Sequence, residues 1–295
     1  MRPWYRIVVI ILLAVPLWGQ APISQLYLFK IQRPTNTQWV VHSPKYLSGF
    51  NRGGYNNQPF FINDQEILLA VQESGSIQTE IYQLHLEQRS FHRLTQTTYS
   101  EYSPNLTPDG KYISCVRVDD PVTSLQRLYR YERNSVGRLN SPLPEIKNVG
   151  YHTWLDNNTV ALFLVNKPNQ LALVDITSKD PLIFTSDVGR CMTKNGAGHL
   201  IFVHKISDAY WYIKEYDPLL QKSTILCETL SGSEDFVQTP EGQFIMAKGS
   251  KLYKTDPRTE KAWTEIADLR YFGLQSISRL ALRGENLILV NQPSK

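Results

Sequence analysis

Residues 103–114 read Ser-Pro-Asn-Leu-Thr-Pro-Asp-Gly-Lys-Tyr-Ile-Ser. Pro108 fixes φ at the second position of a turn, and Gly110 can supply the positive φ that the twist of a β-hairpin needs. An apolar strand follows from Tyr112. The stretch therefore predicts a tight hairpin between two β-strands.

Related turn-and-strand units recur along the chain, beginning at residues 61, 154, 193, 238 and 282. Successive units are offset by about 40 to 50 residues, the length of a four-stranded propeller blade. Helical periodicity is nearly absent. The repeat predicts an all-β fold of six blades, whose innermost strands are expected near residues 57–62, 103–106, 152–155, 191–194, 236–239 and 277–282.

The last unit lacks its two outer strands, because the sequence ends at Lys295. Two strand-like segments stand upstream, at residues 25–31 and 38–42. We expect them to pair with residues 277–282 and 286–290 and so to complete the sixth four-stranded blade. A ring closed in this way leaves no open sheet edge between its ends. A linear array of hairpins is the alternative, which the blade-length period disfavours.

The N-terminus has the pattern of an export signal. Arg2 and Arg6 precede an apolar run from Ile7 to Leu17, and Gly19 offers a small residue at a cleavage site. The run is shorter than the ~20 residues that span a bilayer, which disfavours the alternative of an uncleaved anchor. We therefore expect a signal peptide over residues 1–19 and a single propeller domain over residues 20–295. The mature chain is expected in the periplasm or at the cell surface, without a transmembrane anchor.

Charge and cysteine content exclude some classes of function. The formal net charge is +4, two of these charges fall in the expected signal peptide, and no basic run stands out. A nucleic-acid partner is therefore not expected. Cys115, Cys191 and Cys227 fit no metal-binding spacing and are interpreted as small core residues. No metal and no cofactor is expected.

Residues 103–111 resemble the repeat signature of TolB-like, WD-type propellers, in which Ser-Pro-x-x-(Ser/Thr)-Pro-Asp-Gly-Lys precedes an apolar strand. The match is partial at residues 58–61 and 239–242 and eroded in the other units. Blade period and order extend the resemblance over residues 24–292. It implies an exported bacterial propeller, but this family shares no single chemistry, so a function does not follow from the repeat.

Motifs for catalysis are missing from the sequence. There is no Gly-x-Ser-x-Gly elbow, and the expected innermost strands carry no acidic residue at their centres. Glycoside hydrolysis needs two carboxylic acids about 5–10 Å apart. Only Glu101 and the pair Glu234 and Asp235 come close, just before the innermost strands. No catalytic residue is predicted.

The links that lead into the innermost strands are rich in aromatic and arginine residues, which binding sites for proteins, peptides and sugars favour. We expect these links to gather around one mouth of the central channel. The candidate binding residues are Arg52, Tyr55, Tyr99, Glu101, Tyr102, Tyr151, His152, Arg190, Asp235, Phe236, Arg270 and Tyr271. The alternative is that these aromatic side chains plug the mouth and pack between blades.

Together these features favour a non-catalytic binding or scaffold propeller of the bacterial cell envelope, engaging a protein or peptide partner at the channel mouth. An enzyme acting on carbohydrate or peptide at the same mouth is the alternative function, and a small-ligand sensor is a third. A glycan is the other class of partner that such a mouth suits.

Overall fold

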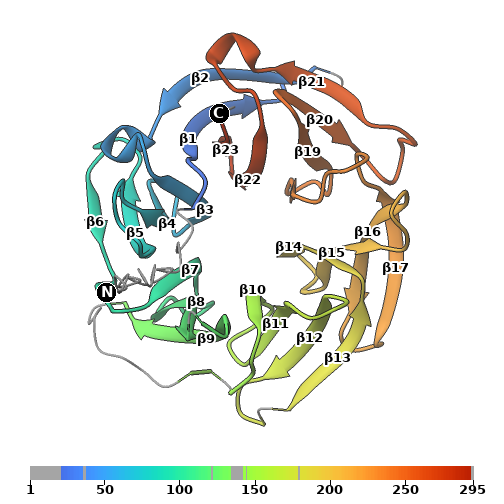
Figure 1. The fold of residues 1–295 in the computed structure, drawn as a ribbon. Helices are drawn as coiled ribbons and strands as arrows, with labels where there is room; N and C mark the ends of the chain where they lie inside the picture. The colour runs from blue at the N-terminus through green and yellow to red at the C-terminus, as the bar shows by residue number, and fades with distance from the viewer. Residues whose placement is uncertain are drawn as a thin grey trace, which may run out of the picture.

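A computed structural model describes residues 21–35, 38–120, 122–133, 142–143, 145–178 and 180–293. The expected signal peptide, residues 1–19, lies outside them. The described strands form six antiparallel sheets that circle one axis like the blades of a propeller (Figure 1). The prediction of an all-β, six-bladed propeller is confirmed.

The blades follow one another in chain order. Blade 1 holds β3 (Tyr55–Phe61), β4 (Glu66–Gln72), β5 (Glu80–His85) and β6 (Phe91–Arg93), and blade 2 holds β7 (Ser100–Leu106), β8 (Tyr112–Asp120) and β9 (Leu125–Glu132). Blade 3 holds β10 (Val149–Trp154), β11 (Thr159–Leu164), β12 (Gln170–Asp175) and β13 (Pro181–Ser186). Residues 134–141, which follow β9, are not among the described ones.

The second half of the chain repeats this order. Blade 4 holds β14 (Val188–Lys194), β15 (Leu200–Lys205), β16 (Trp211–Asp217) and β17 (Lys222–Glu228), and blade 5 holds β18 (Phe236–Gln238), β19 (Phe244–Lys248), β20 (Lys251–Thr255) and β21 (Thr264–Asp268). Blade 6 combines β22 (Ile277–Arg283) and β23 (Asn286–Asn291) with β1 (Gln25–Gln32) and β2 (Val40–Tyr46). Two short 3-10 helices, η1 (Ser48–Asn51) and η2 (Arg270–Phe272), lead into β3 and β22.

The ring closes as the sequence predicts. β1 pairs antiparallel with β23, with Gln25 opposite Asn291 and Lys30 opposite Asn286, and β2 adds to the outer side of β1. Figure 1 shows these early strands, in blue, beside the red strands of the C-terminal half. Leu26 and Phe29 of β1 are fully buried. The two ends of the chain therefore hold each other in one sheet.

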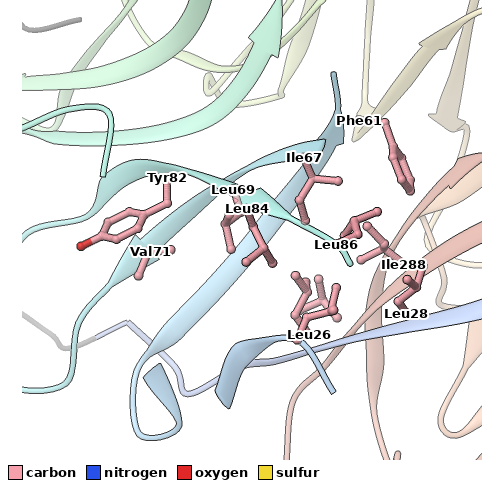
Figure 2. Packing of buried hydrophobic residues seen from close by; sticks show 12 residues of the cluster. Leu26, Leu28, Phe61, Ile67, Leu69, Val71, Tyr82, Leu84, Leu86 and Ile288 are labelled. Carbon is pink, nitrogen blue, oxygen red and sulfur yellow. The ribbon is translucent and has the colours of Figure 1, made fainter. Parts of the chain in front are cut away.

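The core lies between the blades. The second strand of each blade is buried on both faces, which explains why it reads as a continuous apolar run. In β4, Ile67 and Leu69 pack toward blade 6, whereas Leu68 packs toward blade 2, because successive side chains of a strand point to opposite faces. Figure 2 shows the contact between blades 6 and 1, where Leu26 and Ile288 meet Ile67 and Leu84.

The two ends of the channel differ. We call the face at which the innermost strands begin the mouth face, and the other end the turn face. The repeated hairpin turns lie on the turn face, where Asp109 and Asp156 accept hydrogen bonds from nearby backbone N–H groups at 2.8–3.1 Å. These carboxylates therefore serve local turn geometry.

All three cysteines are free. Cys191 lies on the innermost strand of blade 4 and Cys227 on its outermost strand, as the sequence predicts. Within the described part of the chain, no helix is long and apolar enough to cross a bilayer.

Candidate functional site: the channel mouth

The axis of the propeller contains a channel of about 390 Å³, lined by the innermost strands of all six blades. At the mouth face a second hollow of about 300 Å³ adjoins it. Tyr151, Arg190 and Arg279 line both spaces, so these three residues mark the junction between them. We call the second hollow the channel mouth.

The Ser-Pro half of the repeat motif shapes the channel wall. Ser103 precedes Pro104 with φ 51°, and Gln58 precedes Pro59 with φ 56°. The register of both strands shifts at these points, and the Ser103 N–H donates to Gln58 Oε1 at 2.8 Å. The motif therefore encodes a β-bulge that turns backbone and polar side chains toward the axis.

An ion-pair network crosses the channel at its junction with the mouth. Arg190 pairs with Asp235, and its Nη1 lies 3.3 Å from Glu234 Oε1. Arg279 Nη1 lies 3.4 Å from the other oxygen of Asp235, Oδ1. Lys205 Nζ lies 2.8 Å from Glu234 Oε2. The network links blade 4 to blades 5 and 6 and holds both guanidinium groups in place.

Tyrosine side chains complete the mouth. Arg279 Nη2 donates to the hydroxyl of Tyr151 at 2.7 Å and lies over its ring. The rings of Tyr55 and Tyr102 meet edge to face with their centroids 6.5 Å apart. Burial raises the pKa of Tyr55 above its usual value, so its hydroxyl stays neutral at physiological pH.

The two arginines remain charged. Burial alone would lower the pKa of Arg190, but the carboxylates of Asp235 and Glu234 hold it above its usual value. Burial also lowers the pKa of Arg279, but the carboxylate of Asp235 raises it, and the net result is a pKa above the usual value. The mouth thus combines fixed positive charge with phenol hydroxyl groups.

The structure brings five of the predicted residues together at the channel: Tyr55, Tyr102, Tyr151, Arg190 and Asp235. Most of these positions belong to the first part of an innermost strand, so they sit on a more rigid support than the links that the sequence suggested. Only Asp235 immediately precedes its strand.

Two more predicted residues form part of the channel wall but are mostly buried. Phe236 meets Phe244 edge to face, at 5.6 Å between centroids. His152 Nε2 lies 2.8 Å from Ser114 Oγ, and burial lowers the pKa of this histidine to about 3. His152 is therefore a neutral residue that joins blades 2 and 3.

The remaining predicted residues do not line the channel or its mouth. Glu101 is fully buried between blades 1 and 2, and Tyr99 stacks on Arg117, 4.4 Å from the ring centroid. Arg52, Arg270 and Tyr271 are exposed on the mouth face, in or beside the two 3-10 helices.

Sequence reasoning missed Arg279, the residue that connects the network to Tyr151. It lies in β22, an innermost strand whose lack of acids argues against a catalytic pair but says nothing about a cation. A cation inside a channel-lining strand was the signal available. Among the described residues, no group of three or more His, Cys, Asp or Glu side chains is placed to hold a metal ion.

No family model matches this sequence, and no curated protein matches it either. Solved structures do match. A protein described as TolB from Agrobacterium tumefaciens superposes with a TM-score of 0.67 at 12% identity, covering 93% of this chain and 100% of that one. TolB from Acinetobacter baumannii gives 0.58 at 14% identity, covering 92% of this chain and 65% of that one. The fold is that of the TolB propeller.

An enzyme shares the same architecture. An oligogalacturonate lyase in complex with manganese superposes with a TM-score of 0.57 at 12% identity, covering 87% of this chain and 83% of that chain. At these identities the similarity establishes the fold alone. The argument for a function has to come from the residues of the channel and its mouth.

Proposed function

We propose that this chain is a non-catalytic binding propeller of the bacterial cell envelope, and that it engages a protein or peptide partner at the channel mouth. The observation that carries the proposal is the convergence of five blades on one hollow. Tyr55, Tyr102 and Tyr151 come from blades 1, 2 and 3, and Arg190 and Arg279 come from blades 4 and 6.

Tyrosine and arginine are the residue types that dominate binding energy at protein interfaces. Here both arginines are fixed by ion pairs, and the tyrosines stand on paired strands. A partner would therefore meet side chains that lose little conformational entropy on binding. That property suits a recognition surface.

The proposed location follows from the sequence. Residues 1–19 have the pattern of a signal peptide, which supports export to the periplasm or the cell surface. The TolB-type fold of the chain agrees with an envelope setting. A glycan is the alternative partner.

The test is capture of partners from envelope extracts by the tagged mature protein and by a variant with Arg52, Tyr102, Tyr151 and Arg270 replaced by Ala. These four residues lie on the mouth face or in the mouth. The control variant carries Leu219→Ser and Leu220→Ser, two exposed residues of the β16–β17 turn on the turn face.

We expect the wild type and the control to capture the same protein at similar levels. The mouth variant should capture at least about tenfold less of it, as the loss of interface hot spots predicts. Thermal melting of each variant checks that the fold is intact. Equal recovery by the folded mouth variant would reject the proposal. Turnover of an oligosaccharide or peptide panel by the wild type would replace it with the enzymatic alternative.

A further inference from the structure

The ion-pair network at the channel mouth carries excess positive charge. Its cations are Arg190, Arg279 and Lys205, and its anions are Glu234 and Asp235, so the network carries a net charge of +1. The exposed side-chain fractions are only 15% for Arg279 and 11% for Asp235. A partly buried, uncompensated charge favours the approach of an anion.

Hydrogen-bond donors at the mouth also lack acceptors. Arg190 Nε is buried and has no hydrogen-bond partner among the described residues. The hydroxyl groups of Tyr55 and Tyr102 make no hydrogen bond to another described residue, although both side chains line the mouth. Guanidinium groups and phenol hydroxyl groups are donors that suit a carboxylate, which accepts several hydrogen bonds at once.

Exposed apolar side chains are more numerous on the mouth face than on the turn face. Of the thirteen large apolar side chains that are exposed in the described part, seven lie on the mouth face and only two on the turn face. The seven are Ile23, Ile77, Val122, Val165, Ile206, Tyr210 and Tyr271. Most of them sit on loops between second and third strands, and Tyr271 is 92% exposed in η2.

From these observations we infer that the channel mouth binds a carboxylate of a peptide segment, contributed by an acidic side chain, while apolar residues of the mouth face contact apolar side chains beside it. This inference rests on the proposed function and names the chemistry of the partner. Charge complementarity selects an anion. The exposed apolar side chains of the mouth face can contact apolar side chains of a peptide, which favours a peptide over an acidic sugar.

The experiment selects peptides from a random heptapeptide phage library against the immobilised mature protein. The expected result is enrichment of Asp or Glu flanked by apolar residues. An enriched peptide is then synthesised in two forms, one with its Asp or Glu and one with Asn or Gln at that position. Calorimetry measures the affinity of the mature protein for each form. We expect the acid to bind at least about tenfold more tightly, as a hydrogen bond to a charged group predicts.

Two arginines of β22 supply matched variants. Arg279→Gln removes the guanidinium at the mouth, while Asp235 keeps its ion pair with Arg190. Arg283→Gln removes an exposed guanidinium at the turn face, where it pairs with Asp64 at 2.7 Å. We expect Arg279→Gln to abolish the preference for the acid and Arg283→Gln to leave it unchanged. Tyr55→Phe, which removes only a hydroxyl, should weaken it by a smaller factor.

The acid–amide comparison uses the wild type, so it stands even if Arg279→Gln does not fold. Equal affinity for the two peptides, or a library without acidic enrichment, would overturn the inference. Binding of tri-galacturonate without peptide enrichment would overturn it in favour of an acidic glycan. If the peptide experiment fails but envelope capture still depends on the mouth residues, the proposed function survives without this inference. If both experiments fail, the proposed function and the inference are both rejected.

Discussion

The sequence predicts Glu101 at the mouth, whereas the structure shows it fully buried beside β5. Thr97 Oγ1 donates to its Oε1 at 2.6 Å, and the Tyr131 hydroxyl lies 3.4 Å from the same oxygen. The Oε2 atoms of Glu101 and Glu80 are both buried, and the two carboxyl groups interact with each other. The ionisable groups around them are Arg93, Arg117, Tyr131 and Cys115.

Burial, followed by the charge of Glu80, raises the pKa of Glu101 to about 8. Between pH 4.5 and 8 the folded state then binds more protons at this site than the unfolded state, so stability falls as pH rises through this window. Urea unfolding from about pH 6 to about pH 9 should show a loss of about 2 kcal/mol that Glu101→Gln removes.

The control for that prediction is Glu241→Gln, which changes an exposed carboxylate of a turn and should keep the pH dependence of the wild type. Equal slopes of unfolding free energy against pH for the wild type and Glu101→Gln would show that Glu101 is ionised in the folded protein.

The sequence predicts which residues lie at the mouth only where their side chains follow the regular strand pattern. Tyr55, Tyr102 and Tyr151 were predicted as mouth residues because they stand just before expected inner strands. Glu101 satisfies the same rule, yet period 2 turns it away from the axis into the space between two blades. Arg279 reaches the network through a register shift in β22 between Ile277 and Arg279, which the repeat does not encode.

At the scale of elements, β1 is the strand on which ring closure depends. Phe29 is fully buried against Leu287, Leu289 and the ring of Phe272. Phe29→Ala should therefore lower the free energy of unfolding by about 3–5 kcal/mol, the range for a large buried side chain. Lys30→Ala on the same strand, at a half-buried position, should change it by about 0.5 kcal/mol.

Chemical denaturation of the two variants measures both values. A loss for Phe29→Ala no larger than that for Lys30→Ala would mean that β1 contributes little to closure.

The sequence predicts the strands well because turn residues and apolar runs are local signals. Strand beginnings were less predictable: β7, β10 and β14 each start about three residues before the expected position, since the polar and aromatic residues at the mouth do not read as strand.

At the scale of the whole molecule, the propeller separates two kinds of surface. The turn face carries hairpins whose carboxylates accept hydrogen bonds from nearby backbone groups. The mouth face carries the arginines and tyrosines of the channel mouth and seven of the thirteen exposed large apolar side chains of the described residues. The repeat predicts the ring and its closure, because period and strand count are properties of the sequence. It does not predict which charges meet across the axis, since those residues come from different blades.

Hydrogen exchange of the mature protein, with and without its captured partner, tests the central claim most directly. The account predicts that the partner slows exchange at residues 100–102, 149–152, 188–190 and 277–279, which surround the mouth. Protection confined to residues 62–65, 107–111 and 155–158, the hairpin turns of the turn face, would contradict it.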